Sequence, residues 1–250
     1  MDFNLKGRVA LVTGGANGVG REIALALADE GAAVAVNYRS STEDANKVVS
    51  EIEARGGRAV AYGADVADHE AVKAMVAKVA SDLGSLDILV NNAGLALRNR
   101  FVDTKPDEWK RQIDTCLYGA IHTCHASASL LEKSGHGRII SLIGDSSRVG
   151  ESGLSIVAAA RAGVVGLMKS LAREMGRSGV TANALSLGLI ETAHDKAWVD
   201  ANREKLVKFY PTRRLGQPSD IAPTVALLAS DGGAWITGQV ISISGGFSMV

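Results

Sequence analysis

Apolar runs of strand length alternate with longer helical patterns along the whole chain of 250 residues. The runs are nearly continuous in Val, Ile, Leu and Ala, which is typical of strands covered on both faces in a parallel sheet. Strands are predicted at residues 9–12, 33–37, 59–62, 88–91, 138–143, 181–185 and 239–243. Helices are predicted at residues 20–30, 43–55, 69–83, 107–131, 155–176 and 219–229. This order predicts an α/β fold with a doubly wound, seven-stranded parallel sheet.

The composition narrows the class of protein. No linker or repeat interrupts the pattern, so residues 1–250 are expected to form a single domain. The 27 basic residues balance the 27 acidic ones, which argues against nucleic acid or an anionic membrane as a partner. Two cysteines provide no metal-ligand cluster, so no metal is expected. Neither a signal peptide nor an apolar run of about 20 residues is apparent, and a cytoplasmic location is expected.

A glycine-rich turn follows the first predicted strand and opens the first predicted helix. It reads Thr13-Gly14-Gly15-Ala16-Asn17-Gly18-Val19-Gly20. Glycines let the backbone approach a pyrophosphate closely, and the start of a helix supplies free N–H groups. The strand–turn–helix context predicts a dinucleotide-binding loop, and a plain turn is the alternative. The predicted contacts are Gly14, Asn17, Gly18, Val19 and Gly20.

The second predicted strand ends in Asn37-Tyr38-Arg39-Ser40-Ser41, without an acidic residue. NAD sites usually place an acid here to bond the ribose 2′-hydroxyl, whereas an arginine suits the 2′-phosphate of NADP. Arg39 and Ser40 are therefore predicted to hold that phosphate, and NADP(H) is favoured over NAD(H). A solvated surface arginine is the alternative.

Polar residues also follow the third and fourth predicted strands. The carboxyl ends of parallel strands face the crevice where ligands bind. Asp65 is expected to bond the adenine amine, and Asn91 is expected to support the adenosine. The alternative for each is a turn residue that bonds its own backbone. The predicted cofactor contacts in these two segments are Asp65, Val66, Asn92, Ala93 and Gly94.

Residues 189–211 are polar and rich in aromatic side chains, and they fall between a strand and a helix. Doubly wound enzymes often carry a lid over the substrate at this point, because binding residues concentrate on loops. A substrate lid is predicted here, with a surface pair of helices as the alternative.

These motifs resemble those of the short-chain dehydrogenase/reductase family over essentially the whole chain, and its β-ketoacyl-acyl carrier protein reductases look nearest. The resemblance rests on residues 13–20, 65, 91–94, 109, 214–222 and 236–238. It implies a Rossmann-type fold, an NAD(P)(H) cofactor, a homotetramer, and a small-molecule substrate whose carbonyl is reduced or alcohol oxidised. It also implies cofactor contacts at Gly188, Ile190 and Thr192, with Thr192 at the nicotinamide carboxamide.

The family's catalytic set is an Asn, a Ser, a Tyr and a Lys, and the resemblance implies that all four are changed in this chain. The Asn position, before a Leu in the helix after the fourth strand, is Cys116. The Ser position, at the end of the fifth strand, is Gly144. The Tyr and Lys positions, four apart before Ala-Gly-Val, are Val157 and Arg161. Gly144 and Val157 are thirteen residues apart, the spacing that the family keeps between its Ser and Tyr.

These residues bear directly on the chemistry. Hydride transfer to a ketone puts negative charge on oxygen, which a general acid or a fixed donor must stabilise. Val157 offers neither, and Gly144 offers only its backbone N–H. Arg161 keeps the positive charge of a lysine and is expected to bond the nicotinamide ribose. A ketone reductase that works in the usual way is therefore not expected.

Three functions remain open. In the first, the proton donor has moved, with Asp145 near the rim of the site as one candidate and a plain polar loop as its alternative. In the second, an iminium or a conjugated double bond accepts hydride without an enzyme acid. The first two together predict an NADP(H)-dependent oxidoreductase that reduces a C=O, C=N or activated C=C bond with a non-standard proton source. The third is a catalytically inactive NADP-binding partner or sensing subunit. Other candidate donors are Tyr118, Ser146, Ser147, Glu151, Ser155, His194 and Tyr210.

Overall fold

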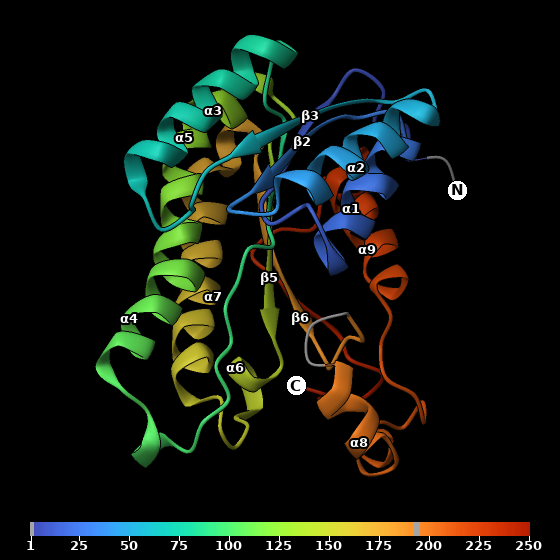
Figure 1. Ribbon diagram of the computed structural model, residues 1–250. Coiled ribbons are helices and arrows are strands. Elements are labelled where there is room, and N and C mark those ends of the chain that lie inside the picture. Colours follow the sequence, from blue (N-terminus) through green and yellow to red (C-terminus); the bar gives the residue numbers. More distant parts are fainter. Residues whose placement is uncertain (1–2, 193–195) are drawn as a thin grey trace.

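The computed structural model describes residues 3–192 and 196–250 and contains one parallel sheet of seven strands (Figure 1). The strand order is β3-β2-β1-β4-β5-β6-β7, and all neighbouring strands are parallel. The first three strands are added toward one edge of the sheet and the remaining four toward the other, so the order reverses between β1 and β4. The strands are β1 Val9–Val12, β2 Ala33–Tyr38, β3 Arg58–Gly63, β4 Ile88–Asn91, β5 Arg138–Gly144, β6 Thr181–Leu187 and β7 Val240–Ile243. The predicted seven-stranded, doubly wound fold is confirmed.

Helices cover both faces of the sheet (Figure 1). α1, α2 and α9 lie on one face, and α3, α5 and α7 lie on the other. The longer helices are α1 Gly18–Asp29, α2 Thr42–Ala54, α3 His69–Leu83, α4 Pro106–Ile113, α5 Gly119–Ser134, α7 Ser155–Met175, α8 Lys196–Leu206 and α9 Ala222–Ala229.

The first strand shows why the sheet needs both layers. Successive side chains of a strand point to opposite faces. Ala10 and Val12 enter the core beneath α1, α2 and α9, whereas Val9 and Leu11 enter the core beneath α3, α5 and α7. All four are buried, which explains why the strands read as continuous apolar runs rather than alternating ones.

The helix predicted over residues 107–131 differs from the structure. α4 ends at Ile113, a π-helical segment occupies Asp114–Tyr118, and α5 begins at Gly119. A π-helical turn inserts one residue into the helical ladder, and the apolar period of the sequence does not reveal it. The sulfur of Cys116, inside this segment, lies 3.4 Å from both the backbone nitrogen and the backbone oxygen of Leu95. The insertion therefore aims Cys116 at the segment that follows β4.

The helical stretch Ser155–Ser178 corrects one expectation from the sequence. It is long and apolar enough to cross a membrane by length and composition alone, and 22% of its apolar window is buried inside the protein. In the fold it packs along β5 and β6 as one of the helices that cover the sheet. Its outward side carries small residues, including Ala159, Ala162, Gly163 and Gly166.

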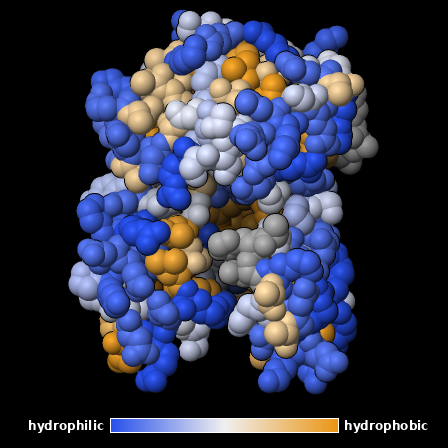
Figure 2. All heavy atoms as spheres, in the orientation of Figure 1, coloured by the Kyte–Doolittle hydropathy of each residue, from blue (hydrophilic) through white to orange (hydrophobic). Residues whose placement is uncertain are grey.

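The carboxyl ends of the strands open into a cleft. β5 runs into the short helix α6 Ser146–Val149, and β6 leads toward α8. Figure 2 shows the surface hollowed between the part that holds α4 and α6 and the part that holds α8, with apolar side chains on its wall. Doubly wound sheets bind ligands at this edge.

Candidate active site

The glycine-rich loop has the shape of an anion cradle. Gly14 and Gly18 have positive φ angles of 61° and 52°, which favour glycine. Asn17 precedes α1 and its side chain makes no capping hydrogen bond, so the first N–H groups of the helix are left without a side-chain cap. Such N–H groups, together with the positive end of the helix dipole, bind phosphate.

Two asparagines, the buried Asn37 and the half-buried Asn92, hold this loop in place. The backbone nitrogen of Gly14 donates to Asn37 Oδ1 at 3.2 Å, and that of Gly15 donates to the Asn37 carbonyl at 2.8 Å. Asn92 Nδ2 donates to the carbonyl oxygens of Thr13 and Gly14, at 2.9 and 3.0 Å. The Asn92 side chain therefore holds the loop, whereas the sequence predicts that it contacts the cofactor directly. The sequence analysis assigns no role to Asn37. A buried amide in an otherwise apolar strand is nevertheless a signal of a structural hydrogen bond.

Gly20 shows how tightly the loop is packed. A Cβ atom at this position would lie 2.3 Å from the Gly14 carbonyl oxygen and 2.4 Å from Asn92 Nδ2. Both neighbours are held by the hydrogen bonds just described, so neither moves without disturbing the loop. The loop conformation thus requires glycine at position 20.

Arg39 and Ser40 follow β2 and lie exposed beside this loop. Neither side chain makes a hydrogen bond or an ion pair with any other residue in the described ranges 3–192 and 196–250. A guanidinium and a hydroxyl without protein partners are suited to a phosphate group. Their position and freedom fit the predicted contact with a 2′-phosphate.

The acid that follows β3 is engaged with its own turn. Asp65 Oδ1 accepts a hydrogen bond from the Ala67 backbone nitrogen at 2.9 Å, which is the turn geometry named above as its alternative. Val66 is buried, and its carbonyl oxygen lies 3.0 Å from His122 Nδ1. This segment borders the nucleotide side of the cleft.

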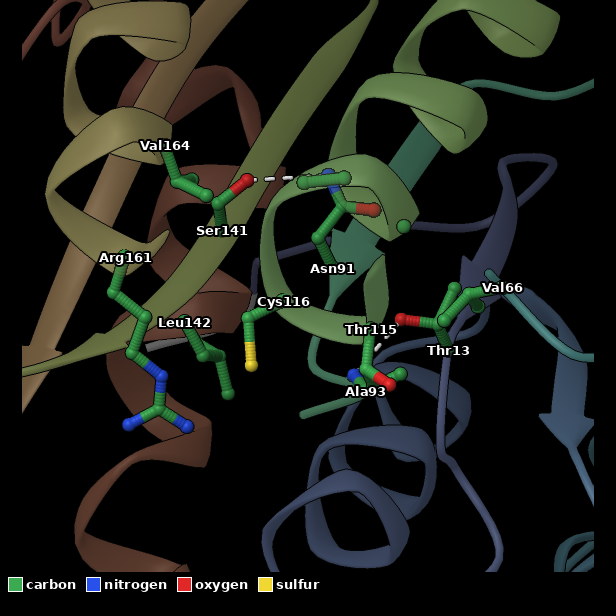
Figure 3. Close-up of a pocket in the computed structure, with 12 residues that line it drawn as sticks. Thr13, Val66, Asn91, Ala93, Thr115, Cys116, Ser141, Leu142, Arg161 and Val164 are labelled. Carbon is green, nitrogen blue, oxygen red and sulfur yellow. Dashed lines mark hydrogen bonds between the residues drawn. The ribbon is translucent and has the colours of Figure 1, made fainter. Parts of the chain in front are cut away.

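Asn91 is tied into the core rather than turned toward a ligand. Its Nδ2 donates to Ser141 Oγ at 3.1 Å (Figure 3), and its Oδ1 accepts from Thr123 Oγ1 at 2.7 Å. The residue is 7% exposed. It therefore links β4, β5 and α5 at the wall of the pocket, and the expected support of an adenosine stays a prediction.

The segment after β6 brings its predicted cofactor contacts to the same cleft. Thr192 lies beside the loop, because a Cβ at Gly18 would be 3.3 Å from its Cγ2 atom. Ile190 forms an isolated bridge with Gly216. A Cβ at Gly188 would lie 3.0 Å from the ring of Tyr210, so the chain there runs close to the segment of the predicted lid.

A pocket connects the two sides of the cleft (Figure 3). Thr13 and Ala93 line it on the nucleotide side, and Arg161 lines it on the other. The Arg161 side chain extends from α7, and its guanidinium does not contact the other side chains labelled in the figure. The remaining lining residues are Val66, Asn91, Thr115, Cys116, Gly119, Ala120, Ser141, Leu142 and Val164.

The guanidinium of Arg161 lies between two glycines. A Cβ at Gly144 would be 2.9 Å from Arg161 Nη1, and a Cβ at Gly94 would be 3.1 Å from Arg161 Nη2. The absence of side chains at both positions leaves room for the two ends of the guanidinium. Within the described part of the chain, Arg161 has no hydrogen-bond or ion-pair partner.

Comparison with known proteins identifies the family. A family model described as enoyl-(acyl carrier protein) reductase matches residues 14–248. The 3-oxoacyl-[acyl-carrier-protein] reductase FabG of Staphylococcus aureus is 45% identical over 240 residues, which cover 96% of this chain and 98% of the relative. The enzyme of the same name from Escherichia coli is 36% identical, with 99% and 100% covered.

The chain belongs to the short-chain dehydrogenase/reductase family.

Two solved structures superpose closely on this one. A dehydrogenase/reductase from Sinorhizobium meliloti has a TM-score of 0.92 at 36% identity, covering 99% of this chain and 98% of its own. A blue fluorescent protein from a metagenomic library, in complex with NADPH, has a TM-score of 0.93 at 34% identity, covering 98% and 100%.

The fold brings together the positions that the family resemblance assigned to the catalytic set. Val157 is fully buried and packs with Cys116 and Ala160. Gly144 and Arg161 meet as described above. The side chains at these four positions are a thiol, a valine methyl pair and a guanidinium. Hydroxyl groups lie around them: Ser146 Oγ would be 3.4 Å from a Cβ at Gly144, and Thr13, Thr115 and Ser141 line the pocket.

Asp145, proposed from sequence as a relocated acid, lies next to this group but turns toward the sheet. It is 2% exposed, and its Oδ1 accepts hydrogen bonds from Ser186 Oγ at 2.5 Å and Ser242 Oγ at 3.4 Å. Its Oδ2 has no hydrogen-bond partner among the residues that the structure describes. Ser147 Oγ donates to the Gly144 carbonyl oxygen. This carboxyl therefore faces β6 and β7.

The other candidate donors have structural partners or lie away from the pocket. Glu151 accepts a hydrogen bond from Arg98 at 2.6 Å, and Ser155 is exposed. Tyr210 is 5% exposed and accepts from the Leu189 backbone nitrogen at 2.9 Å, and burial raises its pKa. Tyr118 is half exposed. Position 194 lies outside the described residues.

Proposed function

We propose that this chain is an NADP(H)-dependent oxidoreductase that reduces a C=O, C=N or activated C=C bond with a proton source other than an active-site tyrosine. One observation carries the proposal: a packed glycine loop with an uncapped helix start shares its pocket with the unpartnered guanidinium of Arg161. The first feature suits a nucleotide, and the second suits a developing negative charge.

The cofactor assignment draws on residues that remain free to bind. The glycine loop would hold the pyrophosphate, Arg39 and Ser40 the 2′-phosphate, and Arg161 the nicotinamide ribose. Gly188, Ile190 and Thr192 would border the nicotinamide. Bound NADPH would supply hydride to the substrate. The relation to a structure in complex with NADPH supports the choice of NADP(H).

The substrate would enter between Arg161 and the segment after β6. The relatives named above are 3-oxoacyl-[acyl-carrier-protein] reductases, so a 3-oxoacyl thioester is the first substrate to test. Val157 packs with Cys116 and cannot donate a proton as a tyrosine does. Water would be the proton source for the reduced product.

A second candidate function is a catalytically inactive NADP-binding partner or sensing subunit. The observation that favours it is the apolar packing of Val157, Cys116 and Ala160 where the family resemblance puts catalytic groups. Such a chain would keep its nucleotide site and lose turnover.

Surface features of α7 and of residues 189–211 bear on the assembly and on the lid. The outward side of α7, rich in small residues, would pack against a second copy in a homotetramer located in the cytoplasm. Residues 189–211 would form the substrate lid. Arg98 supports this, because it pairs with Glu151 and its guanidinium lies 5.3 Å from the ring centre of Trp198 on α8.

The test of this proposal is turnover by the purified protein. NADPH oxidation is followed with a 3-oxoacyl thioester, an isolated ketone, a conjugated enone and a cyclic imine, beside a no-substrate control. We expect NADPH-dependent reduction of at least one activated substrate. Tight NADPH binding with no turnover on any of the four would favour the inactive subunit.

A further inference from the structure

We infer that Arg161 is the catalytic residue that holds the substrate oxygen as it becomes anionic, and that the substrate is an α,β-unsaturated carbonyl compound. This rests on the proposed function, which it narrows from three bond types to one.

The guanidinium spans two places at once. Its Nη1 lies on the side of Gly144, where a side chain from the end of β5 would otherwise stand. Its Nη2 lies on the side of Gly94, in the segment after β4 that borders the predicted cofactor site. A lysine ends in one ammonium group, whereas arginine presents donors on both arms of a rigid fork. One side chain can therefore bond the cofactor ribose with one arm and a substrate oxygen with the other.

The charge of Arg161 is available for a ligand. Neither Asp145 nor Glu151 forms an ion pair with it: Asp145 accepts a hydrogen bond from Ser186, and Glu151 pairs with Arg98. Leu142, Val157 and Cys116 form apolar walls beside it, and the Ser146 hydroxyl lies close to Gly144. A fixed positive charge in such surroundings stabilises a developing anion more strongly than it would in water.

The same charge selects among substrates. An iminium is itself a cation, so the guanidinium would repel it. An isolated ketone would become a localised alkoxide, a strong base that needs a proton at its oxygen at once. The positions of the family's Ser and Tyr are Gly144 and Val157 in this chain, and neither side chain is an acid. An α,β-unsaturated carbonyl becomes an enolate, whose charge is delocalised and is suited to charge-assisted hydrogen bonds.

The step balances without an enzyme acid. Hydride adds to the β-carbon, the C=C electron pair moves toward the carbonyl, and the carbonyl π pair moves onto oxygen. Arg161 keeps its protons and donates hydrogen bonds to that oxygen. The α-carbon then takes a proton from water, which restores the carbonyl and completes the two-electron reduction.

Two variants of Arg161 test its role against a control on the same helix. Arg161→Met removes the charge and Arg161→Lys keeps it with a single donor group. Arg173→Met is the control, since Arg173 is exposed on α7. With a conjugated enone, we expect Arg161→Met to lower kcat by about 100-fold, as loss of an oxyanion donor does, with KM changed much less. The control variant should stay within twofold of the parent enzyme. A loss below threefold in Arg161→Met would overturn the inference.

Gly144 provides an independent check of geometry. Gly144→Ala would place a methyl group 2.9 Å from the present position of Nη1 and displace that arm of the guanidinium. We expect it to lower kcat by about 10-fold in the parent enzyme and to have no further effect in Arg161→Met, the signature of two coupled positions. Additive effects in the double variant would contradict the proposed contact.

A binding measurement keeps the inference testable in the absence of turnover. Crotonate carries a carboxylate beside a conjugated double bond and serves as a stable anionic probe in calorimetry, with NADP⁺ present and absent. We expect binding to the parent protein and to Arg173→Met, and a loss of at least about 10-fold in Arg161→Met. Equal binding by all three proteins would overturn the anion site. If the parent protein does not bind NADPH, the proposed function itself is wrong. If it reduces an imine in preference to an enone, only the inference about Arg161 and its substrate is overturned.

Discussion

The two halves of the cleft are built in different ways. On the nucleotide side, Asn37 and Asn92 fix the glycine loop by five hydrogen bonds, and Gly20 is enclosed by that loop. On the other side, the Arg161 guanidinium has no partner among residues 3–192 and 196–250, and Asp145 keeps one oxygen unbonded. The nucleotide half is thus specified by backbone geometry, which substitutions easily destroy. The catalytic half depends on a few side chains, which evolution can exchange without unfolding the protein.

The largest expected effect comes from disturbing the nucleotide half. Gly20→Ala would place a Cβ 2.3 Å from the Gly14 carbonyl oxygen and open the loop. We expect NADPH binding to weaken by about 100-fold or more, equivalent to about 2.7 kcal/mol, in a calorimetric titration. Gly176→Ala is the matched control, because a Cβ there meets nothing within 4 Å. Unchanged affinity in Gly20→Ala would mean that the loop does not bind the nucleotide.

The catalytic half should accept a change of chemistry. The combined change Gly144→Ser, Val157→Tyr and Arg161→Lys places the family's hydroxyl and ammonium groups in the pocket. We expect reduction of an isolated ketone to rise by about 100-fold, the contribution typical of a general acid, measured as NADPH oxidation. All three changes are needed together, because a Cβ at Gly144 lies 2.9 Å from Arg161 Nη1. A folded triple variant without any gain would show that the pocket has diverged beyond these positions.

Arg39 should decide between the two nicotinamide cofactors. Replacing a cation that bonds the 2′-phosphate by an acid removes a charge-assisted contact of about 1.5–3 kcal/mol. We expect Arg39→Asp to weaken NADPH by roughly 10–100-fold and to leave NADH nearly unchanged. The exposed Arg173, changed to Asp, controls for net charge. Equal losses for both cofactors would remove the NADP(H) assignment.

The smallest effect belongs to the connection between the sheet and the proposed lid. Tyr210→Phe keeps the ring stacked on Phe247 but leaves the Leu189 N–H without its acceptor. We expect a loss of about 1–3 kcal/mol in the free energy of unfolding, measured by urea denaturation. Tyr118→Phe, on a half-exposed residue, should change it by less than about 0.5 kcal/mol. An equal response from both tyrosines would show that the hydroxyl of Tyr210 does not anchor Leu189.

The sequence predicts the sheet well because each strand is covered on both faces and reads as one apolar run. The π-helical segment Asp114–Tyr118 was missed, since one inserted residue leaves the apolar pattern almost intact. The roles of Asn37 and Asn92 were also out of reach, because they depend on loops that meet only in space.

The candidate site was predictable in its members but not in their contacts. The family spacing gathers Gly144, Val157 and Arg161, and the fold does bring these positions together. That the guanidinium occupies the space beside both Gly94 and Gly144 follows only from side-chain reach. The direction of Asp145, toward Ser186 rather than the pocket, also needed coordinates.

The most direct test of the central claim is a calorimetric titration of the purified protein with NADPH and with NADH. A complete nucleotide half with a free Arg39 predicts a roughly micromolar Kd for NADPH and at least about 10-fold weaker binding of NADH. No binding of either nucleotide would contradict the account, because the glycine loop would then be a structural turn beside an unused pocket.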